Sequence, residues 1–391
     1  MNTALHAYPS PFTHESRILR ETESLVDSGL FDRIYVGAIW DEGLAEHEEL
    51  DTRRTVWRVP LRTRRLPGII GKLLRFLEWY IRLFLRFRNE ELTFINCHSL
   101  SVLPLGVLFR LARGCRIIYD THELETETLA SSGIRKRLAK ILERCLIGHT
   151  EAVIVVNESI AGWYRDAYGL KEVHVVRNIP CPRPITGGKT NRLREAFGID
   201  PGSLLFLCQG ILGEGRGIPI LLEVFGRLPS DRHVVFLGNG PMAKEVRLHA
   251  MRYPNIHHHP AVPPHELLEY TAGADVGISL IENVCLSYYY SLPNKVFEYL
   301  MSGVPVVVSD FPEMARLVDG TGCGWKSSVD TRCFAELAGS LTREEIERRA
   351  AIARQVSNSL SWHTEEASLV ALYKKLTNHQ TIGGGNLCAS G

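Results

Sequence analysis

The sequence predicts an α/β protein of two doubly wound domains, each a parallel sheet with helices on both faces, with a cleft between the two. Short apolar runs that are typical of buried strands alternate with helical stretches up to about residue 178. A segment rich in Pro and Gly, 179–189 (IPCPRPITGGK), interrupts this alternation as a linker between domains does. The alternation starts again after it. We therefore expect one domain over 1–180 and a second over 190–360.

The expected elements can be placed in order along the chain. The first domain has a helix from 15 to 28 and strands with the sequences TALHAY, RIYVGAI, LTFINCH, RIIYDTH, EAVIVVN and VHVVRN. The second domain has strands with the sequences LLFLCQG, HVVFLGNG, IHHHPAV, VGISLI and VPVVVSD. The run VPVVV is apolar throughout, as expected for a parallel strand covered on both faces. A last helix is expected over 361–378, and 379–391 is expected to be a flexible tail.

Composition excludes several classes of protein. Of the 391 residues, 45% are hydrophobic and 23% are charged, which is ordinary for a soluble globular protein and excludes disordered and fibrous classes. The nine cysteines include no C-x-x-C pair, so neither a disulfide framework nor a structural zinc site is indicated. The chain has no signal-peptide pattern and no apolar run of membrane-spanning length. We therefore expect a cytoplasmic protein.

Positive charge is concentrated in one segment. Residues 53–88 contain eleven Lys or Arg and a single acid, Glu78, which gives a local net charge of +10 in a chain whose total is +1. Part of it, 66–88, has the pattern of an apolar helix with one polar stripe, formed by Lys72, Arg75, Glu78, Arg82 and Arg86. With Trp79 and Tyr80 nearby, this pattern is typical of a helix that lies on an anionic membrane surface. The alternative is a helix packed on the first sheet.

Nucleic acid is a weaker candidate for this positive charge, because no recognition motif or stacking platform accompanies it. We expect no nucleic-acid partner. We expect instead that 66–88 holds the protein at the inner face of the cell membrane as a peripheral protein.

The segment 287–310 (SYYYSLPNKVFEYLMSGVPVVVSD) has the pattern of a loop, a short helix and a buried strand. Pro293 suits the start of the helix and Gly303 its end. A helix N-terminus attracts phosphate through its unpaired N–H groups, and Lys295 in the first turn adds a full charge. Glu298, one turn later, can accept hydrogen bonds from two neighbouring hydroxyls, such as those of a ribose. The segment therefore indicates a nucleotide site; the alternative is an ordinary helix with a solvated polar face.

The pattern P-N-K-x-F-E-Y-x-x-x-G-x-P-V-V-x-S-D, which begins at Pro293, resembles the nucleotide-sugar-binding segment of family 4 glycosyltransferases, retaining group 1 enzymes of the GT-B fold. The resemblance implies that Glu298 is the second glutamate of an E-x7-E motif and holds the ribose. Tyr290 stands where the family has the first glutamate, and Leu292 and Asn294 would also contact the donor. The resemblance further implies an acceptor-side first domain, a donor-binding second domain, and a last helix that crosses back onto the first.

A second segment, 209–217 (QGILGEGRG), follows the first strand of the second domain. Gly210 and Gly215 let the backbone approach a diphosphate, and Arg216 is a permanently charged donor. The segment resembles the family's G-R-x-x-x-K-G loop, whose two basic residues hold the leaving diphosphate. Arg216 matches the second basic position. Since an isoleucine stands at the first, we expect Lys295 to supply the missing charge.

In the first domain, 119–127 (YDTHELETE) follows a strand and resembles the family's D-x-H-E loop. The resemblance implies that His122 faces the donor sugar and the reaction centre. The alternative is a strand-end histidine that is paired with Asp120. Glu123 and Glu127 would lie close to acceptor hydroxyls.

Several further residues are minor candidates. His14 and Arg17, in SPFTHESR, can reach toward the cleft or can belong to an ordinary capped helix start. His98, which ends an earlier strand, is expected to be structural. Glu282 is a candidate for the acidic role that Tyr290 leaves open. The run 257–259 (HHH) is not expected to bind metal, because consecutive strand residues point to opposite faces.

The residues and the resemblance together predict a retaining glycosyltransferase with His122, Arg216 and Lys295 in its catalytic centre. It would move a sugar from a nucleotide-sugar to a hydroxyl of a glycan or lipid-linked acceptor, in cell-surface polysaccharide or glycolipid assembly. The sequence has no D-x-D motif, so no metal is expected at the diphosphate, and no cofactor is expected. A GT-B sugar-nucleotide epimerase and a non-catalytic partner in glycan assembly are the alternatives.

Overall fold

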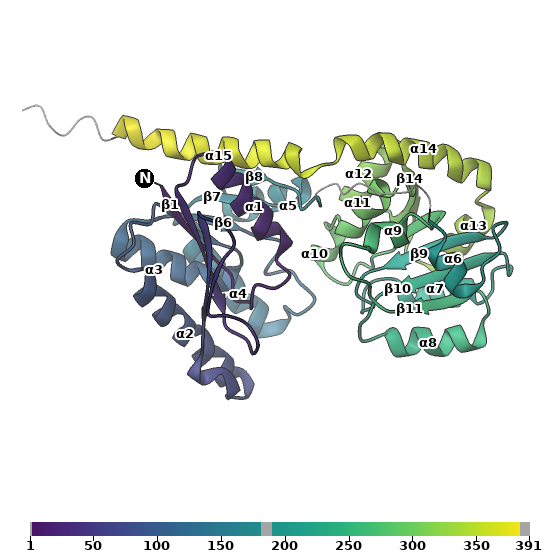
Figure 1. Cartoon of the computed structure of the whole chain (residues 1–391), viewed down its shortest axis with the longest axis horizontal. Coiled ribbons are helices and arrows are strands. Elements are labelled where there is room, and N and C mark those ends of the chain that lie inside the picture. The colour runs from purple at the N-terminus through teal and green to yellow at the C-terminus, as the bar shows by residue number, and fades with distance from the viewer. Residues whose placement is uncertain (1, 181–189, 384–391) are drawn as a thin grey trace, which may run out of the picture. The chain divides into compact units, whose positions relative to one another are not determined.

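The computed structural model describes residues 2–180 and 190–383 and shows two compact units (Figure 1). Unit 1 consists of the chain up to Arg177 together with the segment from Glu365 onward, and unit 2 consists of Asn178–Thr364. Each unit is built on a parallel sheet with helices against it, which confirms the predicted fold class. The linker predicted over 179–189 lies outside the described residues except for its first two positions.

Unit 1 is built on an eight-stranded sheet with the order β3-β4-β2-β1-β5-β6-β7-β8. Neighbouring strands are parallel except β3 and β4, which are antiparallel. The strands are β1 (Thr3–Ala7), β2 (Arg33–Ile39), β3 (His47–Glu49), β4 (Arg54–Val59), β5 (Phe94–Cys97), β6 (Arg116–Asp120), β7 (Thr150–Val155) and β8 (Val173–Val175). The sequence analysis does not predict β3 and β4, because β3 contains no apolar residue and β4 (RTVWRV) has two arginines and lies within the basic segment.

The helices of unit 1 include one that returns from the end of the chain. They are α1 (Ser16–Asp27), the 3-10 turns η1 (Arg62–Arg65) and η2 (Leu100–Val102), α2 (Gly68–Phe87), α3 (Leu103–Arg113), α4 (Gly133–Ile147), α5 (Glu158–Tyr168) and α15 (Trp362–Gly383). In α15, the yellow helix of Figure 1, Tyr373 packs edge-on against Phe31 and Phe94. α15 continues into the segment predicted as a tail, of which 384–391 lies outside the described residues. Unit 1 is therefore assembled from both ends of the chain.

Unit 2 is built on a six-stranded, fully parallel sheet with the order β11-β10-β9-β12-β13-β14. Its strands are β9 (Leu204–Gln209), β10 (Arg232–Leu237), β11 (Ile256–His259), β12 (Val276–Ser279), β13 (Val306–Ser309) and β14 (Gly324–Ser327). Its helices are α6 (Arg192–Phe197), α7 (Ile218–Phe225), α8 (Ala243–Arg252), α9 (Leu267–Thr271), α10 (Leu286–Tyr289), α11 (Asn294–Met301), α12 (Pro312–Thr321), α13 (Thr331–Ser340) and α14 (Arg343–Ser359).

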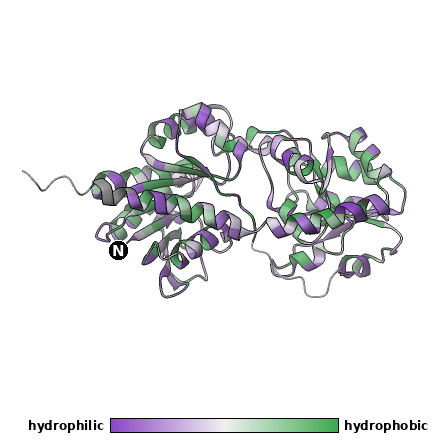
Figure 2. Cartoon of the chain, turned by 90° about the horizontal axis from the view of Figure 1, so that it is seen from above, coloured by the Kyte–Doolittle hydropathy of each residue, from purple (hydrophilic) through white to green (hydrophobic). Residues whose placement is uncertain are grey.

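The sheet of unit 2 is buried on both faces. Along β13, Val307 belongs to the apolar cluster on one face, whereas Val306 and Val308 belong to the cluster on the other. This confirms the two-sided burial that the run VPVVV predicts. The covering helices alternate hydrophobic and hydrophilic residues, as Figure 2 shows, because only one side of each helix meets the sheet. The loops at the carboxyl ends of the parallel strands are thus held on a rigid support.

Candidate functional site

Unit 2 has a pocket of about 620 Å³ at the carboxyl ends of β9 and β10 and the start of α11. Five residues predicted at the donor site line this pocket: Gly210, Arg216, Asn294, Lys295 and Glu298. The other lining residues are Gln209, Ile211, Leu237, Gly238, Asn239, Ala261, Val262, Leu267 and Pro293. The structure therefore brings together two segments, 209–217 and 293–298, that the sequence analysis singles out separately.

Close backbone packing forms one wall of the pocket. Gly238, with φ +152°, lies so near Gly210 that a Cβ on it would be 1.9 Å from the Gly210 carbonyl oxygen. A Cβ on Gly240 would likewise be 2.3 Å from the carbonyl oxygen of Leu212. The loops after β9 and β10 can therefore stack only with glycine at these positions. The sequence analysis does not use the G-N-G run at 238–240, although two glycines directly after a strand are a signal of such close approach.

Two cations at this pocket have no counterion among the residues that the structure describes. Lys295 is only 7% exposed, and neither it nor Arg216 makes a hydrogen bond or ion pair with any described residue. Burial lowers the pKa of Lys295; Arg216 lowers it further, while Cys208 and Glu298 oppose the shift. Since a buried charge without a partner is unfavourable, the pocket suits an anion. The burial of Lys295 disagrees with the alternative of an ordinary helix whose polar face is solvated.

Glu298 is oriented by a short hydrogen-bonded chain. Thr271 Oγ1 donates to Gln209 Oε1 at 2.8 Å, and Gln209 Nε2 donates to Glu298 Oε2 at 2.7 Å. Burial raises the pKa of Glu298, although the hydrogen bond from Gln209 and the charge of Lys295 oppose this. The carboxylate is thus fixed through one oxygen, which leaves the other to accept from a ligand. The sequence analysis includes Gln209 in 209–217 without giving it this role, and it does not name Thr271, because a Thr on a separate helix gives no local signal of this contact.

Three predicted donor residues do not line the pocket. Gly215, with φ +73°, packs under the ring of Tyr288, which a Cβ would approach to 2.8 Å. The ring of Tyr290 lies 5.3 Å from that of Tyr289, and Leu292 packs against the core of unit 2. Glu282 Oε1 accepts a hydrogen bond from the backbone N–H of Gly217, so it stabilises the Gly-rich loop. The structure therefore supports a positioning role for these residues in unit 2.

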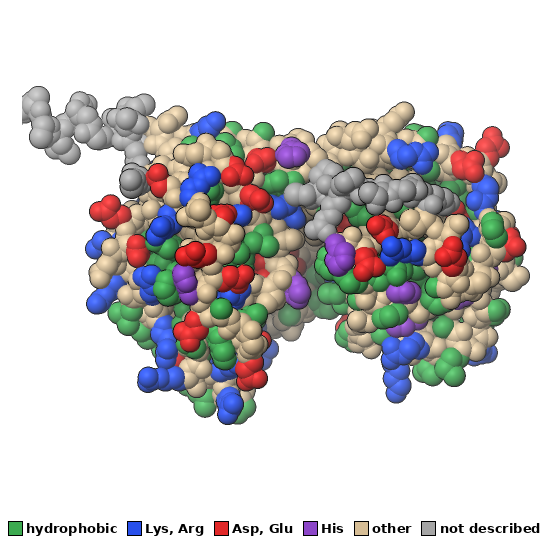
Figure 3. Space-filling model, in the orientation of Figure 1, with side chains coloured by type: hydrophobic (Ala, Val, Ile, Leu, Met, Phe, Trp, Pro, Cys, Tyr) green, Lys and Arg blue, Asp and Glu red, His purple; other side chains and the backbone are tan. Residues whose placement is uncertain are grey.

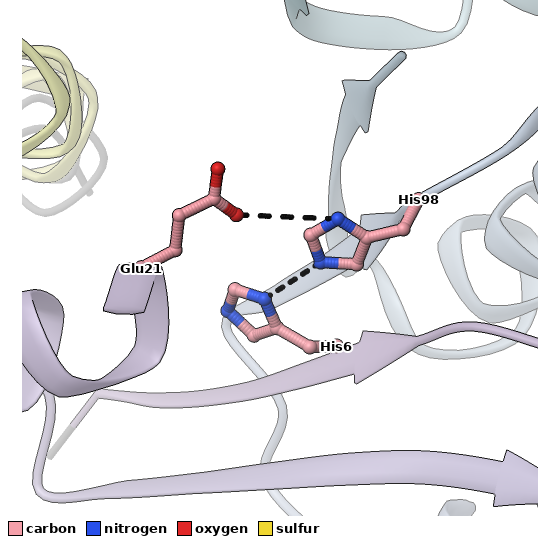
Figure 4. Close-up of side chains that lie close together, drawn as sticks. All are labelled: His6, Glu21 and His98. Atoms are coloured by element: carbon pink, nitrogen blue, oxygen red, sulfur yellow. Dashed lines mark hydrogen bonds and ion pairs between the residues drawn. The ribbon is translucent and has the colours of Figure 1, made fainter. Parts of the chain in front are cut away.

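Unit 1 has a separate polar network at the carboxyl ends of β1, β5 and β6. His6 and His98 are fully buried, with His6 Nδ1 2.9 Å from His98 Nε2, and Glu21 lies beside them (Figure 4). Asn96 Nδ2 contacts His6 Nε2 at 3.0 Å, and Asn96 Oδ1 accepts from the hydroxyl of Tyr373. His98 Nδ1 lies 3.1 Å from Asp120 Oδ2.

These contacts assign one consistent set of protons. If His98 Nδ1–H donates to Asp120, His98 Nε2 accepts from His6 Nδ1–H, and His6 Nε2 accepts from Asn96. Burial lowers the pKa of both histidines, which agrees with two neutral rings. A continuous chain of donors and acceptors therefore links Tyr373 to Asp120.

Asp120 is the fixed anion of this network. Burial acts to raise its pKa, but Arg17, His122 and His98 outweigh burial and hold the pKa well below the usual value. Arg17 Nη2 lies 2.9 Å from Asp120 Oδ1, and Arg17 Nε lies 2.8 Å from Glu21 Oε1. Arg17 also donates to the carbonyl of Val176. This buried guanidinium is committed to the network, so Arg17 does not reach outward as the sequence analysis suggests.

His122 is the accessible end of the same network. Its side chain is 26% exposed, and its Nε2 lies 3.3 Å from His98 Nδ1 and 3.7 Å from Asp120 Oδ2. The ring of Tyr8 is 5.7 Å away. Its polar contact with Asp120 matches the alternative reading, and its exposure leaves the other ring nitrogen available to a ligand.

The neighbouring acids differ in their surroundings. Glu123 is exposed, whereas Glu127 is buried and forms 2.5 Å ion pairs with Lys136 and Lys140 of α4. His14 is exposed. Glu125, which the sequence analysis does not mention, has its pKa raised to about 8 by burial, with Glu123 and Glu143 adding to the shift.

In the described part of the chain, two sets of side chains are spaced closely enough to share a cation: His6, Glu21 and His98, and His98, Asp120 and His122. Arg17 already supplies positive charge to both acids, and the buried rings satisfy one another. These groups therefore contact one another through hydrogen bonds and ion pairs, with Glu21 Oε1 held by its ion pair with Arg17. The run 257–259 belongs to neither set.

Comparisons with known proteins identify the family. The model described as Glycosyltransferase Family 4 matches residues 24–179, and the model described as Glycosyl transferases group 1 matches residues 203–344. Comparison with curated protein sequences finds no match.

Solved structures share the fold over nearly the whole chain. Sucrose-phosphate synthase from Thermosynechococcus elongatus is 14% identical with a TM-score of 0.78, covering 97% of this chain and 100% of that one. Anabaena Alr3699/HepE, in complex with UDP and glucose, is 14% identical with a TM-score of 0.69, covering 97% and 100%. WaaG, a glycosyltransferase involved in lipopolysaccharide biosynthesis, is 15% identical with a TM-score of 0.64, covering 94% and 99%. Since the two family models together span most of the chain, one in each unit, this chain is a group 1 glycosyltransferase of the GT-B fold.

Proposed function

We propose that this glycosyltransferase uses a nucleotide-sugar donor, bound in the pocket of unit 2. The observation that carries the proposal is that Arg216 and Lys295 form no ion pair with any described residue, at a pocket where Gln209 holds Glu298. Two cations suit a diphosphate, and an oriented carboxylate suits the two hydroxyls of a ribose. The complexes of HepE with UDP and with UDP-glucose support the same class of donor.

The proposed reaction proceeds with retention at the sugar. The bond between the sugar C1 and the diphosphate breaks, and the acceptor hydroxyl forms its bond to C1 on the same face. A diphosphate oxygen takes the hydroxyl proton, so no protein carboxylate need act as the base. Arg216 and Lys295 stabilise the charge that the leaving diphosphate gains in the transition state, so the proposal needs no metal there. His122 would contact the reacting sugar.

We also propose that α2 places the enzyme against an anionic membrane, where a glycan or lipid-linked acceptor is available. Gly71, Trp79, Leu83 and Phe87 pack inward, but the opposite side of the helix is apolar and exposed. We call its exposed residues, together with Leu66 just before the helix, the α2 stripe: Leu66, Ile69, Ile70, Leu73, Leu74, Leu77, Ile81 and Leu85. Figure 3 shows hydrophobic side chains among Lys and Arg in this part of unit 1. Among the described residues no helix is both long and apolar enough to cross a bilayer.

The donor site can be tested by binding and turnover. Titration with UDP, GDP, ADP and dTDP and their sugars identifies the base, and wild type should bind one of them saturably. Arg216→Ala and Lys295→Ala should each weaken binding or transfer at least about tenfold, because a charge-assisted contact contributes roughly 1.5–3 kcal/mol. Lys244→Ala removes an exposed charge from α8 and serves as the matched control.

The outcomes separate the candidate functions. Unchanged kinetics in both site variants would contradict the proposed diphosphate site. Epimerised donor without an acceptor product would favour the epimerase alternative. Loss of activity in EDTA that Mg²⁺ restores would contradict the proposed metal independence. The anomeric configuration of the product tests retention.

A further inference from the structure

Besides the pocket of unit 2, the structure has a pocket of about 360 Å³ in unit 1, beside the first half of α2. It lies at the carboxyl end of β2 and the segments that follow β1 and β4, so it shares the sheet edge that carries His122. Its lining residues are Pro11, Ile39, Trp40, Asp41, Leu61, Arg64, Lys72, Arg75 and Phe76. We call it the α2 pocket.

The α2 pocket combines an apolar wall with uncompensated positive charge. Ile39, Trp40, Leu61 and Phe76 supply the wall. Arg64 is paired with Asp41 and lies over the Trp40 ring, with 5.5 Å between its Cζ and the ring centroid.

The other two cations remain available. Lys72 has no hydrogen bond or ion pair with any described residue, and the guanidinium of Arg75 makes only a 3.4 Å contact to the carbonyl of Arg64. Two positive charges beside an apolar surface fit a ligand with an anionic head and a hydrocarbon chain.

The α2 stripe gives that hydrocarbon chain a path to a bilayer. Ile69 and Leu73 flank Lys72 along the helix and are 61% and 63% exposed. An amphiphile with its head at Lys72 and Arg75 can therefore place its tail on these two exposed apolar residues.

The position of the pocket also suits an acceptor. The order β2-β1-β5-β6 separates the end of β2 from the end of β6, which precedes His122, by three strand spacings of about 4.8 Å, on the order of 14 Å. A head group bound at the α2 pocket can thus present sugar hydroxyls along the same edge toward His122.

We propose that the α2 pocket binds the phosphate head of a lipid-linked acceptor. This inference rests on the proposed transfer function for its role as a substrate site, but the binding itself can be measured without a donor.

The test is calorimetric titration of the full chain with octyl phosphate, below its critical micelle concentration and with excess UDP present. Octyl glucoside carries the same tail without the charge, and inorganic phosphate carries the charge without the tail. We expect saturable binding of octyl phosphate, at least about tenfold tighter than either comparison ligand.

Variants localise that binding. The double variant Lys72→Ala/Arg75→Ala should weaken octyl phosphate at least about tenfold and leave the affinity for UDP-glucose unchanged. Arg88→Ala/Arg113→Ala removes two exposed charges from the same unit outside the pocket and should have no effect.

Several results would overturn the proposal. Equal weakening by both double variants would mean non-specific attraction by net charge. Inorganic phosphate that binds as tightly as octyl phosphate would mean a plain anion site, and octyl glucoside that binds as tightly would mean an apolar groove. If none of the UDP-, GDP-, ADP- and dTDP-sugars binds wild type while octyl phosphate binds at Lys72 and Arg75, the donor proposal fails and the lipid-phosphate site stands.

Discussion

In the free protein the charged form of Lys295 is disfavoured, and a bound anionic ligand would stabilise that charged form. Its side chain is buried, and burial together with Arg216 lowers its pKa. A bound diphosphate would favour the protonated form, so its pKa would rise on binding. Donor affinity and the protonation of Lys295 are therefore linked.

We expect donor affinity to fall as pH rises through the lowered pKa of Lys295, below the ordinary value of 10.5. The sign follows because the protonated amine binds the anion, and above that pKa binding must also take up a proton. In Lys295→Arg this fall should disappear, since a guanidinium stays charged. Calorimetry from pH 7 to 10 measures both the affinity and the proton uptake. A wild-type profile that Lys295→Arg reproduces would exclude Lys295 as the titrating group.

The donor pocket was only partly predictable from the sequence. Lys295 and Glu298 lie in one continuous motif, so their spacing on a helix predicts that they face one ligand. Gln209 ends β9, Thr271 ends α9 and the glycines at 238–240 follow β10, so only the folded chain brings them to the pocket. Tyr290 occupies a motif position but does not line the pocket, because the turn after α10 places its ring beside Tyr289.

The sequence leaves two alternatives for α2, a helix packed on the first sheet and a helix that lies on a membrane surface. The structure of α2 has features of both. It packs inward through Trp79, Leu83 and Phe87, as a core helix does, while the α2 stripe stays exposed. Periodicity predicts the polar stripe but not which apolar side meets the sheet, because apolar residues occupy both sides. Arg82 and Arg86 each pair with a nearby glutamate, so the apolar side offers the more direct test of membrane binding.

We expect Ile70→Ser/Leu73→Ser/Leu77→Ser to weaken binding to anionic vesicles at least about tenfold, because each substitution removes apolar area that would enter the lipid interface. The fold should be unaffected, since these side chains are 73%, 63% and 54% exposed. Met251→Ser, at an 85% exposed position in unit 2, is the control. Sedimentation with phosphatidylglycerol vesicles at low salt measures the effect. Equal sedimentation of wild type and the triple variant would rule out the α2 stripe as the contact.

Strands were predictable where burial is two-sided. β2, β9 and β13 stand out as apolar runs, because both of their faces meet helices. β4 alternates buried and partly exposed residues, but its two arginines make its sequence resemble the rest of the basic segment. β3 is exposed at every position and is identified only by its pairing with β4. An edge strand of this kind is defined by its pairing with another segment, and that pairing produces no periodic pattern in the sequence.

The last helix of the chain, α15, packs onto unit 1. Tyr373 of α15 completes an aromatic cluster with Phe31 and Phe94, and its hydroxyl begins the chain of hydrogen bonds that ends at Asp120. Glu365 holds the start of this segment by accepting from the backbone and side chain of Arg177. The polar network at the sheet edge therefore depends on residues more than 250 positions away from it, as the 277-residue separation of Tyr373 and Asn96 illustrates.

Replacing Tyr373 should consequently destabilise unit 1 alone. Tyr373→Ala removes a buried ring and leaves Asn96 Oδ1 without its donor, a change of about 3–5 kcal/mol by comparison with other buried aromatic residues. Hydrogen exchange should accelerate in β1 and β5 and stay unchanged in β9 and β12, because the two units have separate cores. Lys374→Ala, one position along the same helix and exposed, should change neither. Tyr373→Phe isolates the hydroxyl. It retains the ring contacts, so any change in the NMR signals of the His6 and His98 ring N–H groups reports the hydrogen-bonded chain. Exchange that rises equally in both units would show instead that they unfold as one cooperative body.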